Sequence, residues 1–503
     1  MTIQHVWSRG LMGLSLLLLP FAVGCPAWAN PAVSSPPALI GAEAMRADFR
    51  ALYARLRSAQ YAVYARTSKA VLDRAFAAEL ATLNHPMPLV EVQTRFQRFV
   101  AKIKVAHTRI AFPTAAYDRY TKAGNRIFPL ELRIDAGRAF VIAPAADDAN
   151  VALGDEIVRL NGTLMPDVLA RLGRNVSADT PYLAHSIIEH RLPAYLWLEY
   201  GAQPVFELTV RRPDGNVRKV KLAGRTAAEI AAIRPAPRPD PVRVARMLPE
   251  AVAYLRPGPF YNIDLGANPW DTRAFTTYVD SAFRGFLAAG ATTLLIDLRN
   301  NPGGDASFSD PVIAWFATRP FRFVSDFRIR ISDETVASNL ARMAASARDG
   351  VADFISPRLA DLYANAKPGS VRSFPVPLTP PRTGERFTGK VYVLIDRYSY
   401  SNTVSVAAIV QDYRFGTILG EETTDLATTY GAMESFTLPR TGIVVGYAKA
   451  MLIRPSGSLV ARGIVPDIPL HAPLGKNDDD MLDRALAAIR AGCAEPAYRH
   501  ASR

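Results

Sequence analysis

Residues that bind metals or form disulfides are scarce in this sequence. It has two cysteines, Cys25 and Cys493, and seven histidines among 503 residues. The zinc motifs H-E-x-x-H and paired C-x-x-C do not occur in it, and neither does the full phosphate-binding motif G-x-x-x-x-G-K-[ST], because GERFTGK at 384–390 is followed by Val391. A chain that keeps only Cys493 after processing forms no internal disulfide. We therefore expect no metal and no cofactor.

Long apolar segments are scarce as well. The one strong run, Leu11–Val23, follows a basic start and is too short for a comfortable membrane span. Ala27-Trp28-Ala29 then forms a small-x-small cleavage site. We expect residues 1–29 to be an export signal, which predicts a secreted or periplasmic protein with no membrane span after processing. A lipoprotein signal acylated at Cys25 is the alternative.

Acidic residues are fewer than basic ones, and the formal net charge is +13. The arginines and lysines are scattered and form no aromatic-interleaved cluster, so we expect a basic surface and no nucleic-acid partner. The 49% hydrophobic and 21% charged content is typical of a globular protein. At roughly 100–200 residues per domain, the length predicts about three domains.

Three kinds of pattern follow one another along the chain. Apolar residues first recur at helical spacing, as in Phe49, Leu52, Tyr53 and Leu56. Short alternating segments then predict strands, and the last part alternates buried strands with helices, as an α/β domain does. These shifts predict a linker at 30–41, a helical bundle at 42–125, a β-rich domain at 126–225, a linker at 226–244, an α/β domain at 245–475 with a helical insertion near 333–380, and a C-terminal helix and tail at 476–503.

The β-rich segment contains the run LGDEIVRLNG at residues 153–162. This run resembles the L-x-x-G-D-x-I-x-x-I-N-G run of PDZ domains, which bind peptide ends by adding a strand to a sheet edge. The resemblance implies a PDZ-like fold for residues 126–225. Two ordinary turns around a strand are the alternative. The bulky stretch Arg171–Gln203 departs from a minimal PDZ domain and leaves the peptide groove an open question.

One stretch of the last segment predicts a βαβ unit. Val391–Ile395 is typical of a buried parallel strand, Thr403–Gln411 of a helix, and Thr417–Gly420 of the next strand. Chemistry in open α/β sheets lies where strands end and helices begin. Three serines lie there or just beyond, and one of them is a candidate nucleophile: Ser399, Ser401 and Ser405. Helix capping by Ser399 or Ser401 is the alternative, since serine is a favoured N-cap.

A second strand pattern, Thr292–Arg299, leads into Asn300-Asn301-Pro302-Gly303-Gly304-Asp305. Two glycines after a strand permit positive φ and expose backbone N–H groups. Such a bend can donate to the oxyanion of a tetrahedral intermediate. An ordinary turn is the alternative, because these residue types dominate turns.

Together, LLIDLRNNPGG at 294–304 and VYVLIDRYSYSNTVSVAAIVQD at 391–412 resemble peptidase family S41, which includes C-terminal processing proteases and the tricorn core protease. GEETT at 420–424 and GIVPDI at 463–468 resemble two later motifs of that family. The resemblance implies a crotonase-like α/β catalytic domain with Ser401 as the nucleophile. It also implies an oxyanion hole built from the backbone N–H groups of Gly303 or Gly304 and of Asn402.

A serine nucleophile needs a base, and histidine titrates near neutral pH. His107-Thr108 follows the helical segment and matches the end of the D-G-H-T motif of tricorn-like members. The processing proteases use a lysine shortly after G-E-K-T-F-G, whereas this chain has no lysine there before Lys449. The resemblance therefore implies the histidine branch, with His107 as general base. A structural histidine is the alternative.

Three positions depart from the family pattern, namely Ala106, Val404 and Val460. The second and third stand where the family has glutamates, so a different acid is needed to orient His107. The nearby acids that can serve are Glu421, Glu422, Asp425 and Glu434, and sequence spacing does not choose among them.

The sequence therefore predicts an exported serine endopeptidase that acts on proteins or peptides by acyl-enzyme chemistry. Two alternatives stay open. One is a weak or inactive protein of the same fold that binds peptides or apolar ligands. The other is an esterase or amidase that acts on a small substrate. The sequence is also compatible with an oligomer.

Overall fold

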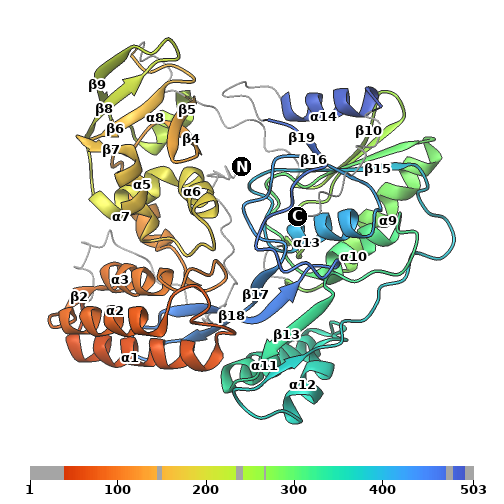
Figure 1. Ribbon diagram of the computed structural model, residues 1–503, viewed down its shortest axis with the longest axis horizontal. Coiled ribbons are helices and arrows are strands. Elements are labelled where there is room, and N and C mark those ends of the chain that lie inside the picture. The colour runs from red at the N-terminus through yellow and green to blue at the C-terminus, as the bar shows by residue number, and fades with distance from the viewer. Residues whose placement is uncertain (1–38, 144–149, 234–241, 265–267, 472–479, 493–503) are drawn as a thin grey trace, which may run out of the picture.

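The computed structural model describes residues 39–143, 150–233, 242–264, 268–471 and 480–492. Within them the chain has the mixed α/β architecture that the sequence predicts, with helices and strands in each of three regions (Figure 1). The predicted export signal, Cys25 and Cys493 lie outside the described residues. No helix in the described part of the chain combines the length and apolarity that crossing a membrane requires.

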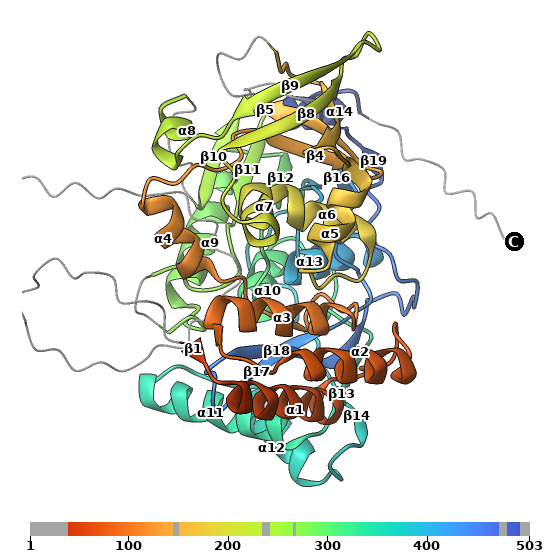
Figure 2. The ribbon, with the colours of Figure 1, turned by 90° about the vertical axis from the view of Figure 1, so that its left-hand side faces the viewer.

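The N-terminal region consists of helices and three very short strands. Its elements are β1 (Leu39–Ile40), α1 (Ala42–Ala59), α2 (Lys69–Thr82), β2 (Met87–Pro88), α3 (Leu89–Ala101), β3 (Arg109–Ile110) and α4 (Thr114–Lys122). The predicted apolar face of α1 is buried, as the helical spacing requires. That face packs against α3 and also against a distant hairpin, β17 (Thr429–Thr437) and β18 (Val444–Ile453). These helices therefore share their core with the C-terminal half, and Figure 2 shows them beside the hairpin.

The β-rich region is an antiparallel sheet with helices on it. The strand order is β4 (Glu131–Asp135), β5 (Arg138–Ala143), β6 (Glu156–Leu160), β8 (Val205–Arg211) and β9 (Val217–Ala223), and β7 (Thr163–Leu164) pairs with β6. Its helices are α5 (Met165–Gly173), α6 (Pro181–His190), α7 (Leu192–Tyr200) and α8 (Ala227–Ile233). The bulky stretch Arg171–Gln203 contains α6 and α7. α6 lies on the side of this region that faces the α/β region (Figure 1).

The α/β region is built on a mainly parallel sheet. Its order is β10 (Val244–Leu248), β11 (Val252–Arg256), β12 (Thr293–Asp297), β15 (Lys390–Ile395), β16 (Thr417–Gly420) and β19 (Ile468–Pro469), and only β10 is antiparallel to its neighbour. One face packs on α9 (Arg273–Ala288), α10 (Ala306–Ala314) and α13 (Asn402–Asp412), and the other on α14 (Asp480–Arg490). Burial on both faces explains the continuous apolar runs of β12 and β15.

A second sheet completes the C-terminal half. Its order is β14 (Val371–Ser373), β13 (Asp326–Arg330), β18 and β17, and α11 (Asp333–Asp349) and α12 (Ser356–Ala364) lie between β13 and β14 in the chain. The short strand β3 also pairs with β18, with Arg109 opposite Gly446 and Ile110 opposite Val445. This pairing joins the end of the helical region to the C-terminal half and so fixes the position of the residues just before β3.

Truncating a ring in the shared core tests whether this packing stabilises the protein. Phe49 is fully buried, and its ring lies 5.0 Å from Phe96 and 5.1 Å from Phe99 between centroids. We expect Phe49→Ala to lower the free energy of unfolding by about 3–5 kcal/mol in denaturant titrations, because it leaves a cavity. Phe354→Ala, at a side chain that is 79% exposed, is the control and should stay within about 0.5 kcal/mol of wild type.

Candidate active site

Ser401 lies in a strained turn between β15 and α13. Its backbone has φ 56° and ψ −124°, a region that non-glycine residues rarely occupy. Its hydroxyl makes no capping hydrogen bond to the helix, although Ser401 occupies the N-cap position. The capping alternative therefore does not describe Ser401. An uncapped serine on a strained strand-to-helix turn is the arrangement that nucleophilic serines adopt in α/β hydrolases.

Two buried groups hold this turn in place. The carboxylate of Asp425 accepts the N–H of Ser401 at 2.7 Å and the N–H of Leu426 at 2.9 Å. The buried hydroxyl of Ser399 donates to the carbonyl of Leu298 at 2.9 Å and accepts from the N–H of Asp396 at 3.1 Å. Ser399 is therefore structural. Burial raises the pKa of Asp425 to about 6, and its hydrogen bonds to the N–H groups of Ser401 and Leu426 oppose that shift.

The diglycine bend packs directly on the turn of Ser401. Gly303 has φ 89°, and a Cβ there would lie 2.6 Å from the carbonyl oxygen of Tyr400 and 2.8 Å from the nitrogen of Asn402. Gly304 has φ 140°, and a Cβ there would lie 2.1 Å from the carbonyl oxygen of Phe260. Neither position accommodates a side chain, so both glycines are required for this contact.

The three predicted oxyanion donors are not equivalent. The N–H of Gly303 already donates to Oδ1 of Asn301 at 3.0 Å. Asn402 is the first residue of α13, where helix geometry provides no partner for the N–H. The N–H of Gly304 has no acceptor within the described part of the chain. The last two are therefore the donors that remain free for a ligand oxygen.

His107 lies beside the same turn. Its ring stacks on that of Tyr400, the residue before Ser401, with centroids 5.3 Å apart and planes at 22°. Only 4% of His107 is exposed. Burial and the charge of Arg109 lower its pKa to about 4, so the imidazole is neutral at pH 7 and able to accept a proton.

The other described histidines have different surroundings. His190 stacks on Tyr398 of the same turn, with centroids 5.2 Å apart. His85 and His471 are exposed, with His85 hydrogen-bonded to Asn84, and His185 is partly buried in α6. His107 is the one that contacts the immediate neighbour of Ser401.

The three glutamates suggested as orienting acids are all held by cations instead. Each carboxylate lies in an ion pair: Glu421 with Arg133 and Arg397, Glu422 with Arg462, and Glu434 with Lys449 and Arg342. The structure gives these glutamates no contact with His107 among the hydrogen bonds and ion pairs of the described residues. Val404 is buried in α13 and Val460 is 66% exposed, so neither position offers a polar group.

Sequence reasoning missed an acid next to His107. Asp179 lies just before α6, and its Oδ2 accepts the N–H of Ala106 at 3.0 Å. It is far from the family motifs in sequence and follows no recognisable pattern, so no local signal marks it. Its position depends on how α6 docks against the loop before β3.

A buried ionic cluster joins α6 to the turn of Ser401. The guanidinium of Arg397 contacts the carboxylate of Glu189 at 3.2 Å and donates to the carbonyl of Ile134 at 3.2 Å. Glu189 also accepts the N–H of Ile134 at 2.6 Å and the hydroxyl of Tyr398 at 2.7 Å. Ile134 lies on the edge strand β4, so the cluster occupies backbone groups that an added peptide strand would use.

Breaking this cluster tests its contribution. We expect Arg397→Met to lower the free energy of unfolding by about 3–5 kcal/mol, because it leaves the buried carboxylate of Glu189 without its cation. Adding Glu189→Gln should restore part of that loss in a double-mutant cycle. Arg348→Met removes an exposed ion pair with Asp349 and serves as the control, with a change below about 1 kcal/mol. A loss equally small for Arg397→Met would contradict the assigned role.

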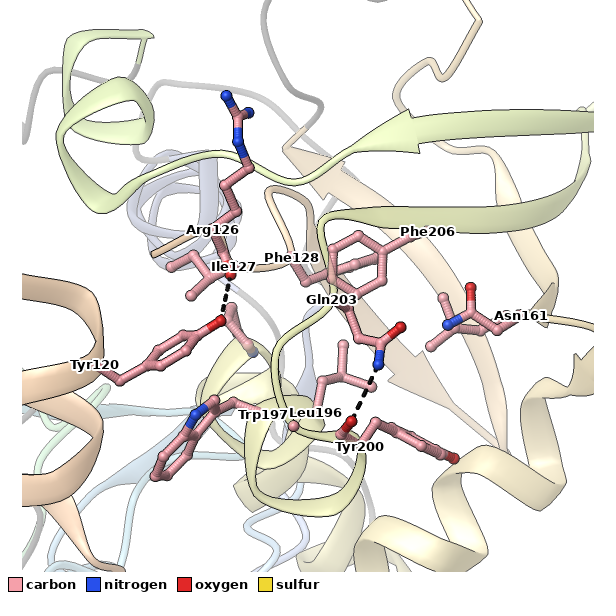
Figure 3. A pocket seen from close by; sticks show the side chains of 13 residues that line it. Tyr120, Arg126, Ile127, Phe128, Asn161, Leu196, Trp197, Tyr200, Gln203 and Phe206 are labelled. Carbon is pink, nitrogen blue, oxygen red and sulfur yellow. Dashed lines mark hydrogen bonds between the residues drawn. The ribbon is translucent and has the colours of Figure 1, made fainter. Parts of the chain in front are cut away.

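A pocket in the β-rich region lies among different residues from those just described (Figure 3). Aromatic side chains line it, including Tyr120, Trp197 and Phe206. The hydroxyl of Tyr120 donates to the carbonyl of Arg126 at 2.9 Å, and Gln203 donates to the carbonyl of Tyr200 at 3.0 Å. The pocket contains no nucleophile paired with a base, so it is not a second candidate active site.

Comparisons with known proteins point to one family. Residues 263–470 match the model of peptidase family S41, and this range contains Ser401 and the diglycine bend but not His107. The structure of mature CPAF complexed with lactacystin is 16% identical, with a TM-score of 0.58, and the match covers 90% of this chain and 100% of that one. Mature CPAF alone is 17% identical, with a TM-score of 0.58, over 90% of this chain and 99% of that one. At this identity the likeness shows a shared fold. No curated protein sequence matches the chain.

Proposed function

We propose that the chain, whose residues 263–470 match the model of peptidase family S41, is a serine-type peptidase that cleaves peptide bonds with Ser401 as nucleophile and His107 as general base. The observation that carries this proposal is the strained, uncapped Ser401, packed against Gly303 and preceded by the tyrosine on which His107 stacks. The neutral imidazole supplies the base that a serine hydroxyl needs near neutral pH.

The proposed reaction is acyl transfer to water through an ester of Ser401. Oγ of Ser401 attacks the peptide carbonyl while His107 takes the hydroxyl proton. The N–H groups of Gly304 and Asn402 hold the oxyanion of the tetrahedral intermediate. The intermediate collapses as His107 gives the proton to the leaving amine. Water, deprotonated by His107, then attacks the acyl ester, and His107 returns that proton to Oγ of Ser401 as the ester bond breaks and the acid product leaves.

We extend the proposal to the surroundings of the site. The export expected from residues 1–29 places the substrate, a protein or peptide, outside the cytoplasm.

The antiparallel order of β4, β5 and β6, followed by α5, supports a PDZ-like unit, and the parallel sheet with α9, α10 and α13 supports a crotonase-like one. At Ile134, strand addition to β4 is blocked by Arg397 and Glu189. A peptide therefore binds this edge only after the cluster opens.

A fluorophosphonate probe tests the nucleophile. We expect the wild-type protein to be labelled and Ser401→Ala to be unlabelled, whereas Ser405→Ala, one helical turn away, should label as wild type. His107→Ala should slow labelling by about 10²–10⁴-fold, because the hydroxyl loses its base. Labelling of Ser401→Ala at the wild-type rate would falsify the assignment.

Turnover of a peptide library compared with that of a small ester separates a peptidase from an esterase. A wild-type protein that neither labels nor cleaves either substrate would indicate the binding-protein alternative.

The pH dependence of labelling tests the state of His107. Because its pKa is lowered to about 4, the neutral base persists as pH falls, and the acid limb should lie well below the usual histidine value of about 6.5. Arg109→Gln should move this limb to higher pH, since it removes a charge that disfavours the imidazolium. Asp425→Asn removes a nearby carboxyl group whose pKa is raised to about 6 and should leave the limb low. A limb near pH 6.5 in both the wild type and Asp425→Asn would contradict this assignment.

A further inference from the structure

We propose that Asp179, from the β-rich region, is the carboxylate that orients His107 and stabilises its charge during catalysis. The proposal rests on the proposed function of Ser401 and His107. It assigns an orienting acid to a chain that has Val404 and Val460 where the family has glutamates. Asp179 acts through His107 and is therefore a positioning residue.

The geometry places the carboxylate against the backbone that carries His107. Oδ2 of Asp179 accepts the N–H of Ala106, the preceding residue, at 3.0 Å. The Asp179 side chain has no exposed surface, and His107 is 4% exposed. Charges interact strongly in such a dry site because little water screens them.

Both groups keep an unused polar atom. Oδ1 of Asp179 and Nδ1 of His107 are buried and lack a hydrogen-bond partner within the described residues. Oδ1 forms an ion pair with Nη2 of Arg66 at 3.2 Å, without the geometry of a hydrogen bond. Buried unpaired polar atoms are costly, so their presence on two neighbouring groups indicates a pair that closes when the ring gains a proton.

The charged groups around the pair are few. Arg109 and Asp179 act on the ring of His107, and the backbone of Tyr430 hydrogen-bonds to it. The carboxylate of Asp179 is in turn affected by the charges of Asp425, Arg66 and His107. Asp179 favours the imidazolium, which is the form that His107 takes after it removes the proton of Ser401.

The other nearby acids do not fit this role. Both oxygens of Asp425 are occupied by the N–H groups of Ser401 and Leu426. The carboxylates of Glu421, Glu422 and Glu434 are held by cations. Asp179 differs from them because its charge acts on His107, and its Oδ1, although in an ion pair with Arg66, accepts no hydrogen bond among the described residues.

One consequence concerns assembly of the site. α6 carries Asp179 before its first turn and Glu189 in its last turn, and the two carboxylates reach the base and the turn of Ser401 respectively. The hydroxyl of Ser186, between them, lies 3.1 Å from that of Thr424. A single helix of the β-rich region therefore completes the site, and the S41-like residues 263–470 alone lack both the base and its acid.

The test compares Asp179→Asn with Asp155→Asn in the full chain. Asp155 is a matched control, because it is also buried, accepts a backbone N–H at 2.8 Å and has an unpartnered Oδ1 in the same region. We expect Asp179→Asn to slow fluorophosphonate labelling by about 10²–10⁴-fold, as loss of the orienting acid does in serine proteases. Asp155→Asn should label at the wild-type rate after correction for the folded fraction.

An NMR titration of the histidine rings adds a readout that a purely structural role would not move. The signal of His107 is assigned by its loss in His107→Ala. Its pKa should fall in Asp179→Asn, which loses the favourable charge, and stay unchanged in Asp155→Asn. Asp179→Glu, which keeps the charge, should recover part of the labelling rate.

The outcomes separate this inference from the proposed function. Wild-type labelling and an unchanged His107 pKa in Asp179→Asn would overturn the role of Asp179 and leave Ser401 and His107 in place. Labelling that survives Ser401→Ala would overturn the proposed function itself. If Asp179→Asn fails to fold, the titration of Asp179→Glu decides: a His107 pKa close to wild type supports the role, and one lowered despite the retained carboxylate contradicts it.

Discussion

The site depends on one strained residue that its neighbours hold in place. Ser401 adopts a positive φ that costs of order 1–3 kcal/mol, and such a conformation persists only where the surroundings over-determine it. Asp425 accepts its N–H, and Gly303 packs so closely on the turn that a Cβ would collide. The strained turn places the hydroxyl of Ser401 at the start of α13, where it makes no capping hydrogen bond. The proposed nucleophile and the proposed oxyanion donors are thus placed by the same contacts.

The remaining groups reach this turn from distant parts of the chain. The pairing of β3 with β18 places His107, and the shared core of α1, α3 and the β17–β18 hairpin holds that pairing. α6 brings Asp179 and Glu189 from the β-rich region. The proposed site therefore requires three regions to be docked together, so the proposed function makes docking a condition for activity and not only for stability.

Buried charge provides the specificity of that docking. Removing water from Arg397, Glu189 and Glu421 is unfavourable unless their geometry is well matched, so an arrangement that separated them would leave buried charges unpaired. The same cluster covers the edge of β4 at Ile134. The edge that a PDZ-like unit would offer to a peptide is thus coupled to the turn that carries the nucleophile.

Local patterns in the sequence were enough to determine the strand-turn-helix at residues 391–411, the diglycine bend and the mixed α/β class, because alternation, helical spacing and glycine conformation are properties of neighbouring residues. The resemblance to peptidase family S41 also rested on such local motifs. Only the tertiary structure decided that Gly303 is already bonded, that Glu421, Glu422 and Glu434 are held by cations, and that Asp179 lies beside His107. These facts depend on contacts between residues tens to hundreds of positions apart, which spacing along the chain does not encode.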